Sequence, residues 1–223
     1  MGNMNEQARV TLQEELQQQK DKFNETAPDE TKITYKKGID EVVESGLVEK
    51  ALQVGESAPD FVLNNAKGER VKLSDHLKNG PVVLTWYRGG WCPYCNLTLY
   101  HLQQTLPAFK ALGAQLLALT PELPDKSLST SEKNNLAFEV LSDIDNRVGK
   151  QYGIVFQLHE GVAKIYGQKF SLSAYNGNKE NELPLAATYI IGQDGIIEYA
   201  FLDADYRNRA NPEDLVAFLK NKK

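Results

Sequence analysis

The feature that most limits how this chain can fold is a pair of cysteines, Cys92 and Cys95, placed between two different hydrophobic patterns. Before the pair, residues 81–87 form a nearly continuous apolar run, which is typical of a strand covered on both faces. After it, apolar side chains recur at helical spacing as far as Gly113. The sequence therefore predicts a buried strand that leads directly into a helix, with the cysteines at the junction.

Predicted strands and helices alternate through the rest of the chain from residue 55. A hairpin is expected from residues 58–63 through a turn at 64–68 to a return strand through Val71 and Leu73. Further strands are predicted at 115–120, 138–141, 188–191 and 196–201, and further helices at 127–137, 146–152 and 212–219. This order predicts an α/β fold in which helices flank a central mixed sheet.

The first 54 residues differ from this pattern, and we expect them to form an N-terminal helical extension. Gln, Glu and Lys dominate from about Asn5 to Phe23, with apolar residues at helical spacing, and a second helix is expected to end near Gly55. Residues 55–223 form the second predicted unit, which carries the cysteines.

Composition and charge exclude several classes of function. The chain has 223 residues, of which 41% are apolar, so it can bury a sizeable core. Its net charge of −5 gives no basic face for nucleic acid or an anionic membrane surface. No leader-like segment or apolar stretch of membrane-spanning length occurs, so we expect a cytoplasmic protein. Two cysteines and three scattered histidines favour redox chemistry over metal binding.

The position of the cysteines suits thiol chemistry, because the thiolate is the reactive form of cysteine. Pro93 is expected at the first helical position, which leaves Cys92 as the cap, where unpaired N–H groups and the helix dipole favour its ionisation. Cys95, one turn into the helix, can form a disulfide with Cys92. The other predicted site residues surround the sulfurs: Arg88 as a nearby positive charge, and Trp91, Pro93 and Tyr94 as a substrate-binding wall.

Several other residues are expected to have structural rather than chemical roles. Trp86 is predicted to be in the core, and His101 to be a surface or packing residue. Loop positions are expected for the remaining polar candidates, which are His76, His159, Glu122, Arg207 and Arg209.

The motif Cys92-Pro93-Tyr94-Cys95 resembles the active-site tetrad of glutaredoxins. The wider sequence resembles the peroxiredoxins of the alkyl hydroperoxide reductase and thiol-specific antioxidant family. Residues 55–61 resemble the opening of that domain, Trp86-Tyr87 the aromatic pair before its cysteine, and residues 190–197 its late hairpin. The resemblance covers roughly residues 55–220 and implies a thioredoxin-like fold.

The family pattern Pro-x-x-x-Thr-x-x-Cys places Cys95 at the peroxidatic position, Cys92 at the Thr and Arg88 at the Pro. The active-site arginine of the family falls near Ala186, so Arg88, or else Arg207 or Arg209, would have to replace it. This register nominates Cys95 as the attacking residue. Helix-cap physics nominates Cys92, which we favour from the sequence.

The resemblance implies a thiol-dependent peroxidase that reduces hydrogen peroxide or organic hydroperoxides through a Cys92–Cys95 disulfide. A thiol donor of the thioredoxin or glutathione type would reset the pair, with no organic cofactor or metal. One alternative is a thiol-disulfide oxidoreductase of the thioredoxin or glutaredoxin type that acts on protein disulfides. Another is a redox-regulated binding protein whose N-terminal extension docks a partner. A homodimer remains open at this stage.

Overall fold

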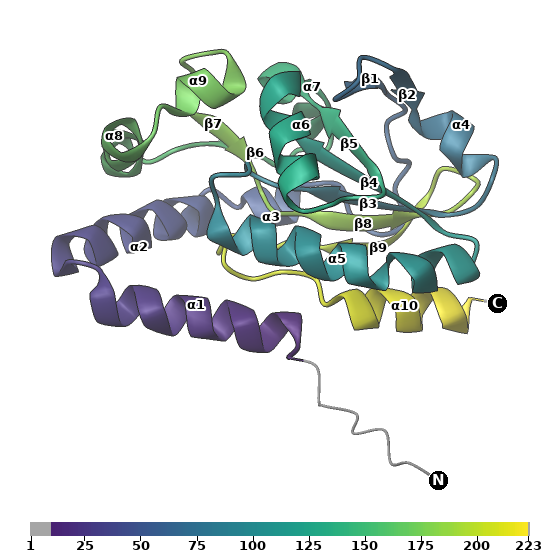
Figure 1. The fold of residues 1–223 in the computed structure, drawn as a ribbon, viewed down its shortest axis with the longest axis horizontal. Coiled ribbons are helices and arrows are strands. Elements are labelled where there is room, and N and C mark those ends of the chain that lie inside the picture. Colours follow the sequence, from purple (N-terminus) through teal and green to yellow (C-terminus); the bar gives the residue numbers. More distant parts are fainter. Residues whose placement is uncertain (1–9, 223) are drawn as a thin grey trace, which may run out of the picture.

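The computed structural model describes residues 10–222, and a seven-stranded mixed sheet forms its centre (Figure 1). The strand order is β2–β1–β5–β4–β3–β8–β9, and β3, β4 and β5 run parallel to one another. Their bounds are β1 (Val62–Asn65), β2 (Arg70–Lys72), β3 (Val82–Trp86), β4 (Gln115–Thr120), β5 (Glu139–Ser142), β8 (Thr188–Ile191) and β9 (Ile197–Phe201). A separate two-stranded sheet pairs β6 (Val155–Gln157) with β7 (Glu182–Pro184). The predicted fold class is confirmed.

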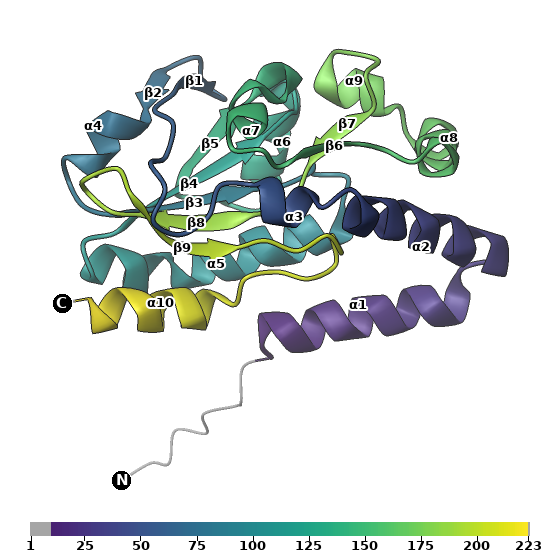
Figure 2. The same ribbon diagram turned by 180° about the vertical axis from the view of Figure 1, so that it is seen from behind.

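Helices cover both faces of this sheet (Figures 1 and 2). On one face, α5 (Pro93–Ala111) and α10 (Pro212–Asn221) pack apolar side chains against Val83, Leu116 and Ile190. On the other face, α4 (Leu73–Leu77) and α7 (Arg147–Gln151) contribute to a second cluster. The remaining helices of the domain are α6 (Pro124–Lys133), α8 (Glu160–Lys169) and α9 (Leu172–Asn176), with a 3-10 turn at Ile144–Asn146.

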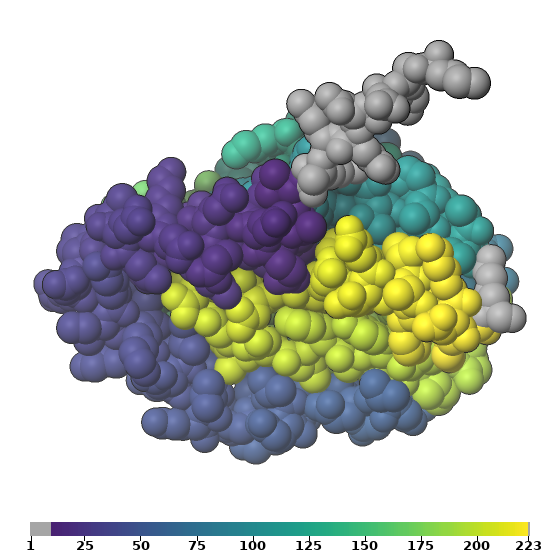
Figure 3. Space-filling model, turned by 90° about the horizontal axis from the view of Figure 1, so that it is seen from below, coloured from purple at the N-terminus to yellow at the C-terminus, as the bar shows by residue number. Residues whose placement is uncertain are grey.

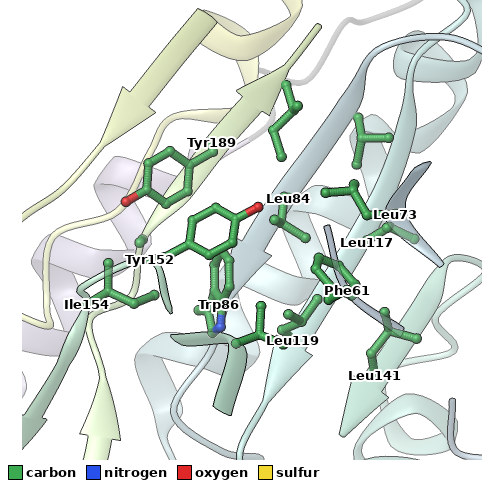
Figure 4. Close-up of a cluster of buried hydrophobic side chains, with 14 of the residues drawn as sticks. Phe61, Leu73, Leu84, Trp86, Leu117, Leu119, Leu141, Tyr152, Ile154 and Tyr189 are labelled. Carbon is green, nitrogen blue, oxygen red and sulfur yellow. The ribbon is translucent and has the colours of Figure 1, made fainter. Parts of the chain in front are cut away.

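The larger core cluster is built around aromatic rings that come from three elements (Figure 4). The ring of Trp86 lies 4.8 Å from that of Tyr152 and 6.0 Å from that of Tyr189, measured between centroids. Aromatic rings at these separations add favourable packing energy beyond their buried area. The predicted core position of Trp86 is therefore confirmed, and the strand that leads to the cysteines is fixed in a rigid layer.

The N-terminal segment folds into α1 (Leu12–Thr26), α2 (Asp29–Glu44) and α3 (Leu47–Lys50). Thr11 and Glu14 form a capping box at the start of α1, which satisfies backbone N–H groups that the helix cannot. Leu12 and Leu16 are buried in a cluster that also contains both cysteines. Figure 3 shows α1 lying beside the segment that leads into α10. The part of the predicted first helix that precedes residue 10 lies outside the described residues.

Most elements of the sheet core match their predicted positions, but residues 153–187 do not. The sequence analysis assigned no element there, whereas β6, α8, α9 and β7 occupy this region. These elements have three to ten residues, too few for a clear hydrophobic period. Leu73 begins α4 instead of continuing the strand, and the expected loop position is wrong for His76, which lies within α4. His159 lies in a loop, as expected, where it forms the N-cap of α8.

Within residues 10–222, no helix is both long enough and apolar enough to span a membrane.

Candidate active site

The cysteines lie where the sequence predicts, at the junction of β3 and α5. Cys92 is the N-cap of α5 and Cys95 lies in its first turn; both are free thiols, with 1% and 0% of their surface exposed. Before them, the loop passes so close to α6 that a Cβ atom on Gly90 would lie 2.0 Å from Thr130 Oγ1. Glycine is therefore required at this position for the loop to hold the cysteines in place.

Negative charge is stabilised on Cys95 rather than on Cys92. The Sγ atom of Cys95 accepts hydrogen bonds from the backbone N–H of Arg88 and from Nη2 of Arg209, both at 3.4 Å. Burial raises the pKa of Cys95, but the hydrogen bond from Cys92 and the charges of Arg209 and Arg88 lower it well below the ordinary value of a thiol. Burial and the hydrogen bond to Cys95 raise the pKa of Cys92.

The expectation that Cys92 is the better placed thiol to ionise is therefore wrong. The helix terminus favours an anion at Cys92. However, the backbone N–H of Arg88 and Nη2 of Arg209 both donate to the sulfur of Cys95, and a buried guanidinium acts at close range in a region of low dielectric constant. The favoured site of the negative charge is therefore Cys95, in the first turn of α5, instead of Cys92 at its N-cap.

Arg209 was expected in a solvated loop, and this expectation is wrong. Its side chain is only 4% exposed, and two side chains of α1 donate hydrogen bonds to the segment around it. Gln13 Nε2 donates to the carbonyl oxygen of Arg209 at 3.2 Å, and Lys20 Nζ donates to Asn208 Oδ1 at 2.7 Å. The neighbouring Arg207 instead pairs with Asp205 at 2.7 Å. The N-terminal extension thus helps to place the guanidinium beside Cys95.

Arg88 provides a second buried cation, as predicted, and is 2% exposed. Its guanidinium lies 4.1 Å from the ring centre of Tyr206, and its Nη2 donates to Tyr166 Oη at 2.8 Å. Its Nε and Nη1 atoms have no hydrogen-bond partner within the described chain, and no ion pair to a carboxylate is found for it there. Because no carboxylate neutralises it there, the charge of Arg88 acts on the two sulfurs and lowers the pKa of each thiol.

A pocket of about 260 Å³ reaches Cys92, and the three predicted wall residues line it: Trp91, Pro93 and Tyr94. Cys95 is not among the lining residues, because it lies behind Cys92. The remaining aromatic wall, which the sequence did not predict, comes from four other segments: Phe23, Tyr35, Tyr166, Phe170 and Tyr206. The spacing of Tyr166 and Phe170 on one helix face was a usable signal, but no local pattern connects Phe23 or Tyr35 to the cysteines.

Glu122 was expected to be a plain loop acid, and this expectation is also wrong. Its side chain is completely buried, and its Oε1 accepts a hydrogen bond from the backbone N–H of Gly90 at 3.0 Å. Burial raises the pKa of Glu122 to about 7, and the negative charge of Cys95 adds to the effect. The carboxyl group therefore changes protonation close to neutral pH, next to the loop that carries the cysteines.

This pKa predicts a pH-dependent effect of Glu122→Gln on stability. The pKa of Glu122 is raised from 4.5 to about 7, so ionisation costs the folded state free energy as the pH rises through this window. The neutral Gln side chain avoids that cost, and its oxygen atom still accepts the hydrogen bond from the backbone N–H of Gly90. In denaturant titrations, the stability of the variant relative to wild type should improve by about 3 kcal/mol between pH 4.5 and pH 8. Glu132→Gln, on an exposed position of α6, is the matched control, and a parallel change in both variants would contradict the assignment.

His101 has the packing role that the sequence favoured. Its Nε2 lies 2.6 Å from Oε2 of Glu15, which joins α5 to α1. Among the described residues, no group of three or more His, Cys, Asp or Glu side chains is arranged to hold a metal ion.

A family model described as "AhpC/TSA family" matches residues 54–200 of this chain. The chain belongs to the AhpC/TSA family. The family prediction made from the cysteine motif and its surroundings is thus confirmed. Arg209 and helices α1 and α2 lie outside the matched region.

Similar proteins include two kinds of thiol enzyme. The peroxiredoxin Bcp of Escherichia coli K12 is 29% identical over 153 residues, which cover 68% of this chain and 86% of that protein. The thiol-disulfide oxidoreductase ResA of Geobacillus kaustophilus is 31% identical over 105 residues, which cover 47% of this chain and 59% of ResA.

Solved structures share the fold. The peroxidoxin BcpB of Mycobacterium tuberculosis has a TM-score of 0.62 at 20% identity and covers 77% of this chain and 99% of its own. A peroxiredoxin-like protein from Aquifex aeolicus has a TM-score of 0.60 at 19% identity and covers 77% of this chain and 88% of its own.

Proposed function

We propose that this protein is a thiol-dependent peroxidase in which Cys95 attacks a hydroperoxide and Cys92 then forms a disulfide with it. The observation that carries the proposal is the hydrogen bonding of the Cys95 sulfur, which receives N–H groups from Arg88 and Arg209 behind a pocket that reaches Cys92. Membership of the AhpC/TSA family and the similarity to peroxiredoxin Bcp support the same activity. This order of attack reverses the one favoured from the sequence.

The reaction proceeds in two steps on the proposed assignment. The thiolate of Cys95 attacks the terminal peroxide oxygen, so that an S–O bond forms and the O–O bond breaks. The leaving oxygen takes the proton of Cys92, whose thiol is already hydrogen-bonded to Cys95. The Cys92 thiolate then attacks the sulfenic acid, which forms the S–S bond, breaks the S–O bond and releases hydroxide; this hydroxide is neutralised by the proton that Cys95 loses when it ionises again after reduction. An external thiol donor returns two electrons and two protons.

The guanidinium groups of Arg88 and Arg209 are assigned the role of the family arginine that is absent near Ala186. Preorganised cations stabilise charge that develops on the attacking and leaving atoms without having to reorganise. Trp91, Pro93 and Tyr94 are proposed to bind the substrate. A thioredoxin- or glutathione-type donor, a homodimer and a cytoplasmic location stay predictions.

The second candidate is a thiol-disulfide oxidoreductase, which the similarity to ResA favours over 47% of the chain. In this reading, the same cysteine pair reduces a disulfide in another protein. The 1% exposure of Cys92 and 0% exposure of Cys95 favour a small peroxide over a protein disulfide as the substrate of the reduced pair.

Two assays on the reduced protein separate these functions. Stopped-flow tryptophan fluorescence with hydrogen peroxide should show a second-order reaction at least about tenfold faster than that of a free cysteine thiolate at the same pH, because of the stabilised charge at Cys95. Reduction of insulin by the protein with dithiothreitol should stay near the rate of dithiothreitol alone. Fast insulin reduction with a peroxide rate no greater than that of free thiolate would overturn the peroxidase proposal.

A further inference from the structure

The pocket beside Cys92 has walls suited to one small aromatic molecule. Seven of its twelve lining residues are aromatic, and its volume of about 260 Å³ lies below the range typical of drug-sized ligands. Trp91 and Phe170 stack at 4.6 Å between ring centres, and Phe23 meets Tyr35 edge to face at 5.5 Å. Such walls favour a flat apolar body over a polar peptide.

The charged side chains that line this pocket are both positive. Arg88 and Lys169 line it, and no acidic residue is among the lining residues of this part of the described chain. Arg88 is buried near the sulfurs and lacks partners for two of its nitrogen atoms. Lys169 is exposed, so it lies on the solvent side of the pocket, and no ion pair with a carboxylate is found for it within residues 10–222. A negative end at the solvent side of the pocket therefore lies beside Lys169 and meets no acidic lining residue.

We propose that this pocket binds a hydroperoxide that carries one aromatic ring and a carboxylate. The ring lies among the aromatic side chains, the carboxylate lies at Lys169 and the peroxide group lies at Cys92, in front of the Cys95 sulfur. The substrate class rests on the proposed peroxidase function, whereas binding of the aromatic carboxylate does not require it. Lys169 and Phe23 are then the residues that determine specificity for charge and for the ring.

The N-terminal extension gives this pocket a wall that the matched family region does not contain. Gln19 and Phe23 of α1 and Tyr35 of α2 line it, and all three precede residue 54. Removal of the Phe23 ring deletes apolar contact without touching Arg88 or the cysteines. The extension thus distinguishes a ring-bearing substrate from hydrogen peroxide, which is too small to contact it.

Binding of an unreactive analogue tests the site without turnover. Isothermal titration calorimetry of the reduced wild-type protein should show 4-isopropylbenzoate binding about fivefold more tightly than its neutral isostere, 4-isopropylbenzamide. Lys169→Gln should remove this preference, whereas Lys164→Gln, an exposed lysine on the same helix outside the pocket, should keep it. Phe23→Ala should weaken both ligands severalfold. Equal affinity of wild type for the two ligands, or an unchanged preference in Lys169→Gln, would overturn the proposed site.

Turnover then tests the substrate class. The ratio of kcat/KM for 4-carboxycumene hydroperoxide to that for cumene hydroperoxide should be about five in wild type and about one in Lys169→Gln. Selective benzoate binding without turnover of any hydroperoxide would refute the substrate class together with the proposed function, but not the carboxylate site. Fast turnover of hydrogen peroxide with no preference between the two aryl substrates would refute the specificity alone.

Discussion

Cys95→Ser is expected to abolish the fast reaction with hydrogen peroxide, whereas Cys92→Ser is expected to keep one rapid oxidation per chain. In Cys95→Ser only the Cys92 thiol remains, and its pKa is raised by burial. A thiol with a pKa of 8.5 or more is about 3% ionised or less at pH 7, so the rate should fall by more than about thirtyfold from ionisation alone. In Cys92→Ser, the introduced hydroxyl group can donate the hydrogen bond that the Cys92 thiol gave, and Arg88 and Arg209 still donate to the Cys95 sulfur.

The oxidised species separates these outcomes further. After one equivalent of peroxide, Cys92→Ser should carry a sulfenic acid at residue 95 that dimedone traps and mass spectrometry localises. Without a second thiol it should form no intramolecular disulfide and should not turn over with a dithiol as fast as wild type. A rapid oxidation that survives in Cys95→Ser and vanishes in Cys92→Ser would reverse the two assignments.

Arg209→Gln is expected to slow peroxide reduction at pH 7 by about tenfold to a hundredfold. It removes one of the two N–H donors to the Cys95 sulfur and a charge that lowers the Cys95 pKa. Loss of a close opposite charge typically moves a pKa by about one to three units, here upward. The rate of the variant should therefore rise more steeply with pH between 6 and 9 than the wild-type rate, because its thiolate fraction grows over this range.

Arg207→Gln is the matched control, because Arg207 lies on the same segment and pairs with Asp205 instead of a cysteine. Arg209→Lys keeps the charge and should restore part of the rate, which distinguishes an electrostatic effect from loss of structure. If the pH profile of Arg209→Gln matches that of wild type, Arg209 has no part in holding the thiolate.

Local patterns predicted the parts of this fold that are long or strongly apolar. The buried run before Cys92 and the hairpin around Gly192-Gln193-Asp194-Gly195 were placed correctly because their side chains alternate or cluster over enough residues to show a period. The position of Cys92 as a helix cap followed from Pro93, which is favoured in the first helical turn.

The site itself depends on contacts that no local pattern reveals. Arg209 is 114 residues from Cys95 in the chain, and α1 fixes its backbone from the other end of the sequence. Glu122 looked like an ordinary loop acid because burial, rather than its neighbours in sequence, sets its pKa. The order of attack proposed here differs from the slight preference for Cys92 for the same reason: the helix dipole can be inferred from the sequence, but distant guanidinium groups cannot.

The most direct test of this account is a thiolate titration of Cys92→Ser, followed by absorbance at 240 nm as the pH is raised. Cys95 is then the only cysteine in the chain. We expect its pKa to lie well below the ordinary thiol value of about 8.5, and Arg209→Gln in the same background to move it upward. A Cys95 pKa at or above 8.5 would contradict the claim that Arg88 and Arg209 hold a thiolate there.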